Sequence, residues 1–247
     1  MNDFMVPDWP APKNVRSMVT TRSGGVSVGP YASFNLADHV GDNPQAVAEN
    51  RKRLRELVPE LPDDPLWLKQ VHGVRCVNAE IQTSGVVADA SWSGSADKVC
   101  AILTADCLPL LLCNDAGTVV SAIHAGWQGL VTGVIETAVN SLPVAPPSLM
   151  AWMGPAIGPT AFEVGADVRD AFYLHDAASA NAFTSIAKGK WLGDLYLLAR
   201  QRLNALRVTR IYGGSECTVT DAERWFSFRR DKVSGRMASL IWLSSLP

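Results

Sequence analysis

Residues 99–124, VCAILTADCLPLLLCNDAGTVVSAIH, contain three short apolar runs separated by polar residues. The runs are Val99 to Leu103, Leu110 to Cys113 and Val119 to Ile123. Short apolar runs bounded by turn residues are typical of β-strands. The stretch therefore predicts three consecutive strands, with Asp106 and Cys107 in the first connection and His124 at the end of the third strand.

The rest of the chain mixes predicted helices and strands. Asp42-Asn43-Pro44 is typical of a helix N-terminus, so we expect a helix over Ala46 to Leu57. Apolar residues at helical spacing predict a helix from Leu130 to Val139. We expect further helices over 165–174 and 194–206, and further strands over 15–20, 66–71, 149–153, 208–212, 225–228 and 237–242. Since no linker or repeat divides the chain, residues 1–247 are predicted to form one α+β domain.

Composition narrows the classes of partner. The net charge is −2, the pI is about 6.1, and hydrophobic residues make up 47% of the chain. A sizeable core is expected, but no basic field that would bind a nucleic acid. Small-molecule partners are therefore favoured. The N-terminus lacks the pattern of a secretory signal, no apolar run is long enough to span a membrane, and the five cysteines form no disulfide pattern, so we expect a cytoplasmic protein.

Three residues that can bind a metal follow apolar runs: His72, Cys107 and His124. The intervals of 35 and 17 residues are too long for a zinc finger but suit a site where several strands end. Each residue alone is also typical of a buried structural side chain. Together, two imidazoles and one thiolate leave a fourth position of Zn²⁺ open, which is the arrangement of a catalytic zinc.

Several motifs resemble one family over a range from about Arg16 to Trp242. They are residues 20–27 (TTRSGGVS), 69–73 (KQVHG), 104–109 (TADCLP), 124–127 (HAGW), 153–158 (MGPAIG), 227–231 (SFRRD) and 235–238 (GRMA). In this order they resemble the bacterial multicopper polyphenol oxidoreductases, or laccase-domain proteins. The resemblance implies layered mixed sheets flanked by helices, an α/β/β/α-like arrangement.

The resemblance also implies an activity. It implies a zinc-dependent purine nucleoside phosphorylase that deaminates adenosine and cleaves methylthioadenosine, with His72, Cys107 and His124 as metal ligands. The family is also linked to the editing of peptidoglycan precursors. Copper stays an alternative metal, since a thiolate and imidazoles bind it as well, and a copper-dependent polyphenol oxidase stays an alternative function. A chain with four histidines has too few imidazoles for a multicopper oxidase.

Two aspartates are candidates for proton transfer or for orienting a ligand imidazole. Asp106 precedes the cysteine ligand, and Asp89 lies in Val87-Ala88-Asp89-Ala90. A zinc deaminase needs a carboxylate as its proton shuttle, and ligand histidines commonly donate to one. Aspartate is also frequent at turns, so a purely structural role stays open for both.

Phosphorolysis needs groups that bind phosphate and substrate close to the glycosidic bond. The candidates for this role are Arg22, Asn35, His39, Arg51, Lys69, Gln70, Arg229 and Arg230. Trp127 or Phe228 is a candidate for stacking on a purine ring.

Three classes of function remain open from the sequence. The first is the zinc nucleoside phosphorylase and deaminase. The second is a cysteine hydrolase acting on a cell-wall precursor, with Cys107 as nucleophile and His124 as its base. The third is a non-catalytic metal-binding protein. The sequence does not rank the nucleosides and does not fix the oligomeric state.

Overall fold

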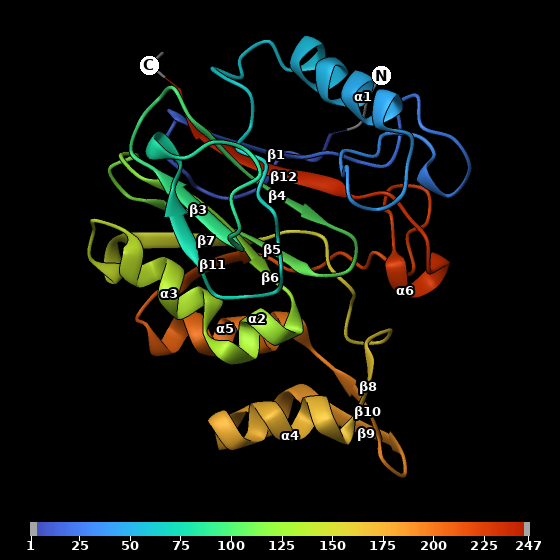
Figure 1. The fold of residues 1–247 in the computed structure, drawn as a ribbon. Helices are drawn as coiled ribbons and strands as arrows, with labels where there is room; N and C mark the ends of the chain where they lie inside the picture. Colours follow the sequence, from blue (N-terminus) through green and yellow to red (C-terminus); the bar gives the residue numbers. More distant parts are fainter. Residues whose placement is uncertain (1–3, 245–247) are drawn as a thin grey trace.

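The computed structural model describes residues 4–244, which fold into four main layers (Figure 1). Helix α1 (Pro44–Leu57) covers a three-stranded sheet, which packs on a six-stranded sheet. Helices α2 (Trp127–Thr132), α3 (Val134–Ser141) and α5 (Leu195–Ala205) cover the far side of the six-stranded sheet. The predicted α+β fold with an α/β/β/α-like arrangement is confirmed.

The three-stranded sheet has the order β1-β12-β4 and is antiparallel throughout. Its strands are β1 (Val15–Val19), β12 (Met237–Leu243) and β4 (Val99–Thr104). Side chains alternate between its faces, as the pleat of a strand requires. In β4, Ala101 and Leu103 share a core with α1, while Cys100 and Ile102 face the second sheet.

The six-stranded sheet has the order β11-β7-β5-β6-β3-β2. Its four central strands are antiparallel, and β11 and β2 add to the edges in parallel. The strands are β2 (Cys76–Asn78), β3 (Ala90–Ser93), β5 (Leu108–Asn114), β6 (Val120–Ala125), β7 (Leu149–Met153) and β11 (Arg210–Gly213).

Strand β5 is apolar without interruption from Leu108 to Cys113. Leu110 and Leu112 belong to the core beneath α2, α3 and α5, whereas Leu111 and Cys113 belong to the core between the two sheets. Because both faces of the strand are buried, no polar residue alternates with the apolar ones. All seven residues of β5 are buried.

A third sheet, with the order β8-β10-β9, lies with α4 (Ala166–His175) beyond α2 and α5 (Figure 1). Its strands are β8 (Glu163–Gly165), β9 (Phe183–Ala187) and β10 (Lys190–Gly193). The remaining helices are α6 (Phe228–Asp231) and four short 3-10 turns, η1 (Gly29–Tyr31), η2 (Ala79–Ile81), η3 (Pro146–Ser148) and η4 (Ala177–Ala182), within residues 4–244. In that same range, no helix has both the length and the apolar character needed to cross a membrane.

Three predicted elements differ in the structure. The helix predicted over 130–139 is two helices, because Gly133 adopts a left-handed φ of 101° between α2 and α3. The strand predicted over 225–228 is wrong: Trp225 and Phe226 are fully buried without a strand partner, and α6 begins at Phe228. The strand predicted over 66–71 is reduced to isolated β-bridges at Leu66 and Lys69.

Candidate metal centre

Three separate segments bring His72, Cys107 and His124 together. His72 lies in the loop before β2, Cys107 in the connection from β4 to β5, and His124 in β6. Leu108 pairs with Ala125 across β5 and β6, which sets Cys107 beside the end of β6 that carries His124. The potential ligand atoms of all three residues lie within 4.8 Å of one another, as the sequence predicted.

One pair of donors has the spacing of a tetrahedral metal site. The Cys107 sulfur lies 3.6 Å from Nε2 of His72. In a tetrahedral zinc site with Zn–S of about 2.3 Å and Zn–N of about 2.0 Å, sulfur and nitrogen lie about 3.5 Å apart. Gly126 makes this close assembly feasible, since a Cβ at that position would lie 2.8 Å from Cδ2 of His72 and 3.0 Å from the Cys107 sulfur.

Asp89 holds two residues of the centre in place through hydrogen bonds. Its carboxylate is fully buried and accepts a hydrogen bond of 2.9 Å from Nδ1 of His124, which leaves Nε2 for a metal. The same carboxylate accepts the backbone N–H groups of Val71, His72 and Gly73 at 2.7–3.2 Å. These bonds hold the tight turn in which His72 has a left-handed φ of 60°. Asp89 therefore positions two of the three ligands.

The ionisable groups of the centre shift one another's pKa values. Burial raises the pKa of the Cys107 thiol, but the charge and hydrogen bond of His124 and the contact with His72 outweigh this and lower it to about 6. Burial lowers the pKa of His124, but Cys107 and Asp89 outweigh it and raise this pKa to about 9. Burial also raises the pKa of Asp89. The hydrogen bond with His124 is the largest of the effects that oppose burial, and together they lower the pKa of Asp89 below its ordinary value. Without a metal, the sulfur is a thiolate paired with an imidazolium at neutral pH.

Asp106 anchors the connection that carries Cys107. Its carboxylate oxygens accept hydrogen bonds of 2.6 Å from the Thr218 hydroxyl and from the backbone N–H of Arg229. Its backbone carbonyl accepts from Ile157, and its φ of 88° is left-handed. Since both oxygens already bind the protein, the structure favours a positioning role, and the role of proton shuttle stays a prediction.

Two cavities open beside the three residues. The first, here called the metal-facing cavity, has a volume of about 360 Å³ and is lined by all three, together with His39, Gln70, Thr104 and Arg236. The second, here called the aromatic cavity, has a volume of about 280 Å³ and is lined by His72 and Cys107 with Trp127, Phe162, Phe228 and Arg229. Phe228 lines both cavities.

The structure brings some of the predicted substrate-binding residues to these cavities. His39 and Gln70 line the metal-facing cavity, and Arg229 lines the aromatic one. Arg51 and Lys69 line a neighbouring cavity of about 430 Å³ that His39 and Gln70 also border. Gln70 uses its amide on the backbone of Leu103, with bonds of 2.7 and 2.8 Å.

The other predicted residues are engaged elsewhere and line none of these three cavities. Arg22 donates to the carbonyls of Ala32 and Ala222, and its guanidinium lies over the ring of Phe226. Asn35 is fully buried and bonds with Ala37, Asp42 and the backbone of Arg236.

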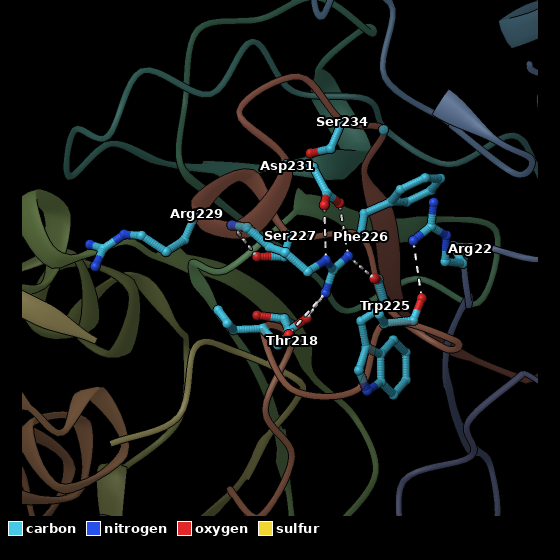
Figure 2. A network of polar contacts seen from close by, with 12 residues as sticks. Arg22, Thr218, Trp225, Phe226, Ser227, Arg229, Asp231 and Ser234 are labelled. Carbon is cyan, nitrogen blue, oxygen red and sulfur yellow. Dashed lines mark hydrogen bonds and ion pairs between the residues drawn. The ribbon is translucent and has the colours of Figure 1, made fainter. Parts of the chain in front are cut away.

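Arg230 donates to three backbone carbonyls, those of Thr218, Val219 and Trp225, and pairs with Asp231. Figure 2 shows this network, from which the side chain of Arg229 points away. The sequence offered no way to separate the two neighbouring arginines.

Two residues of the metal-facing cavity, Thr104 and Arg236, were not among the predicted site residues. Both lie in family motifs, residues 104–109 and 235–238, and this was the available signal. Arg236 is half-buried, and this burial lowers its pKa despite the opposing charges of Cys107 and Asp106.

Comparisons with known proteins place the chain in a family. A family model described as "Multi-copper polyphenol oxidoreductase laccase" matches residues 16–244. The chain is 53% identical to "Purine nucleoside phosphorylase YfiH" of Shigella flexneri over 98% of this chain and 100% of that protein. It is 52% identical to "Purine nucleoside phosphorylase PA4543" of Pseudomonas aeruginosa over 98% and 99% of the two chains.

Solved structures share the whole fold. Protein NMB0706 of Neisseria meningitidis matches with a TM-score of 0.95 and 49% identity over 98% of this chain and all of that one. YlmD of Geobacillus stearothermophilus matches with a TM-score of 0.85 and 27% identity, over 96% and 94% of the two chains. The chain therefore belongs to the multi-copper polyphenol oxidoreductase laccase family.

Proposed function

We propose that this protein is a zinc-dependent purine nucleoside phosphorylase, acting as one catalytic domain over residues 1–247. The observation that carries the proposal is the open-sided group of His72, Cys107 and His124 beside two cavities. A catalytic metal keeps one coordination position free, and three protein donors leave one. The relatives named purine nucleoside phosphorylase, which match nearly the whole chain, support the same reaction.

The reaction joins phosphate to the anomeric carbon of the ribose. An oxygen of hydrogen phosphate forms a bond with this carbon while the bond from the carbon to the purine nitrogen breaks, and that nitrogen takes up the proton that the phosphate gives up. The products are the free purine and ribose 1-phosphate. The sugar is cationic in the transition state, so anionic phosphate must be held close to it.

The chain divides these tasks between its cavities. Trp127 and Phe228 offer aromatic faces to a purine in the aromatic cavity, where Arg229 lies at the margin. His39, Arg51 and Lys69 place positive or hydrogen-bonding groups on the other side of the centre. Zinc held by the two imidazoles and the thiolate would supply a Lewis acid at its open position.

Further activities of the same centre belong to this proposal. Deamination of adenosine and phosphorolysis of methylthioadenosine would use the same purine-binding surface, with Asp89, which bonds His124, and Asp106, which precedes Cys107, as the candidates for proton transfer. Copper stays an alternative to zinc, because a thiolate with two imidazoles also suits it. The free state of all five cysteines is consistent with a reducing cytoplasm, which we propose as the location.

One observation favours a second candidate function. The low pKa of Cys107, about 6, and the chain of contacts from Cys107 to His124 to Asp89 resemble a nucleophile with its base and orienting carboxylate. This arrangement would suit a metal-free cysteine hydrolase acting on a peptidoglycan precursor. Metal dependence separates the two candidates.

The test uses purified protein whose zinc and copper contents are measured. Adenosine, inosine and methylthioadenosine are supplied with and without phosphate, and base, ribose 1-phosphate and ammonia are quantified. We expect phosphate-dependent release of base, lost on chelation and restored by zinc. His124→Ala should reduce turnover to background because a ligand is lost, whereas His175→Gln, at the end of α4, should retain metal and activity.

Two results would contradict the proposal. Metal-loaded protein that converts no purine nucleoside would refute it. Metal-free protein that hydrolyses a cell-wall precursor, and that is inactivated when iodoacetamide alkylates Cys107, would support the cysteine hydrolase instead.

A further inference from the structure

Thr104 and Arg236 meet at one edge of the metal-facing cavity. Thr104 is the last residue of β4, and it pairs with Met237, the first residue of β12. Arg236 directly precedes Met237, so the sheet register sets Arg236 beside the end of β4. Both side chains line the cavity that also contacts His72, Cys107 and His124.

Arg236 presents a fixed and partly unused guanidinium. Its Nη1 donates to the carbonyls of Ser234 and Gly235 and to the Ser234 hydroxyl at 2.7–3.2 Å. Its backbone N–H donates to Oδ1 of Asn35 at 2.9 Å, and its side chain lies over the ring of Phe228 at 5.8 Å. Within residues 4–244, Nε and Nη2 have no hydrogen-bond partner. The protein thus holds the guanidinium at Nη1, while Nε and Nη2 stay available to a ligand.

Thr104 provides a second unused donor. The residue is 2% exposed, and its hydroxyl has no hydrogen-bond partner within residues 4–244. A buried hydroxyl without a partner costs about 1–3 kcal/mol, so such a group at a cavity wall indicates a ligand that completes it. The unpaired hydroxyl thus belongs to a residue that lines the same cavity as Arg236.

The charge of the cavity indicates the kind of ligand. No carboxylate is among the residues, all within the described part of the chain, that line the metal-facing cavity. Arginine, threonine and histidine line it instead, and arginine binds the oxygens of phosphate through two parallel N–H groups. A tetrahedral oxyanion satisfies these donors better than a neutral sugar or base does.

We infer that Arg236 and Thr104 form the binding subsite for inorganic phosphate. The inference rests on the proposed phosphorylase activity and assigns its co-substrate to two residues. Phosphate in this cavity lies against the metal ligands, while the purine occupies the aromatic cavity across Phe228. Arg22 and Arg230 have no part in this subsite, because main-chain carbonyls already hold their guanidinium groups.

Four variants test the assignment in metal-loaded protein. Arg236→Gln and Thr104→Val remove the hydrogen-bond donors. Arg236→Lys retains the positive charge without the planar guanidinium, and Thr104→Ser retains the hydroxyl. Arg16→Gln removes an equal charge from an exposed position of β1 as the matched control. Zinc content and circular dichroism are measured for each variant, so that loss of metal or fold is recognised.

The kinetic readout separates phosphate from nucleoside. We expect Arg236→Gln to raise the KM for phosphate about tenfold or more, since hydrogen bonds to charged groups carry that much affinity, while the KM for nucleoside changes less than about twofold. Thr104→Val should act in the same direction with a smaller effect, and Thr104→Ser should restore the wild-type value. Arg236→Lys should recover only part of the loss.

A binding readout without nucleoside makes the inference independent of turnover. Phosphate is titrated into metal-loaded protein while the melting temperature and the ³¹P line width are followed. Wild type and Arg16→Gln should bind phosphate, and Arg236→Gln should not bind it in the same range. If phosphate binds in this way but no nucleoside reacts, the proposed activity is refuted while the oxyanion subsite is supported. Equal phosphate binding and equal phosphate KM in all variants that retain zinc would overturn the inference.

Discussion

At the scale of single residues, Asp89 determines how the centre takes up a metal. Its carboxylate bonds Nδ1 of His124 and helps to keep the imidazole protonated without a metal. The neighbouring thiol has a pKa of about 6 and is already ionised at neutral pH. Nε2 of His124 must therefore lose its proton when a metal binds, whereas the sulfur loses none.

We expect this pair to release about one proton per zinc ion at pH 7–8. Above the His124 pKa of about 9 the imidazole is already neutral and the release falls towards zero; below the Cys107 pKa of about 6 the thiol also gives up a proton. Between these values, zinc affinity should rise about tenfold per pH unit as one proton is displaced. Calorimetric titration in two buffers of different ionisation enthalpy measures the release.

Asp89→Asn provides the control for this prediction. The amide removes the charge that raises the pKa of His124, so less proton should be released at pH 8, and zinc affinity should fall about 10–100-fold. An unchanged proton release in this variant would show that Asp89 does not govern the ionisation of His124.

The sequence identified the residues of the centre better than their roles. The three candidate metal ligands were predictable because their two imidazoles and one thiolate lie in family motifs. Asp89 and Asp106 were equivalent candidates, since only the folded chain sets one against His124 and the other against Thr218 and Arg229. Arg236 was missed because a surface arginine and a cavity arginine look alike in sequence.

At the scale of elements, the segment around α6 was the least predictable. Trp225 and Phe226 are apolar because they fill the core between the sheets, and not because they form a strand. Arg230 ties this segment together by capping the carbonyls of Thr218, Val219 and Trp225 (Figure 2). The segment also carries Phe228, which lines both cavities.

We therefore expect Arg230→Gln to loosen the α6 segment. Loss of bonds from a charged donor to buried carbonyls should lower the free energy of unfolding by about 1–3 kcal/mol. Urea denaturation followed by tryptophan fluorescence measures this change. Lys232→Gln, an exposed neighbour of equal charge, should change stability by less than about 0.5 kcal/mol. Equal effects of the two substitutions would contradict a structural role for Arg230.

At the scale of the whole molecule, the candidate metal centre lies where the two large sheets meet. His124 belongs to the six-stranded sheet, and Cys107 lies where the chain passes from β4 of one sheet to β5 of the other. Gln70 fastens the His72 loop to Leu103 in β4. The layers were implied by the family resemblance and most strands by apolar runs, but the small β8-β10-β9 sheet was not predicted, because its short strands bury few residues.

A metal at this junction should stabilise the entire fold. At a free zinc concentration of about 1,000 times Kd, binding contributes about 4 kcal/mol. For a chain of this size, that corresponds to a melting temperature about 10 °C higher. Differential scanning calorimetry before and after chelation measures it. His72→Ala should show no shift on adding zinc, and wild type that melts at the same temperature with and without zinc would disprove the link between the sheets.

The low pKa of Cys107 makes its sulfur reactive towards oxidants when no metal ion is bound. A thiolate that forms near pH 6 is open to attack by hydrogen peroxide at neutral pH, and its sulfenic acid can no longer act as the sulfur donor. Occupancy by a cation thus shields the sulfur from oxidants. Metal starvation combined with oxidative stress would therefore inactivate the centre, reversibly at the sulfenic acid and irreversibly once the sulfur reaches the sulfinic acid.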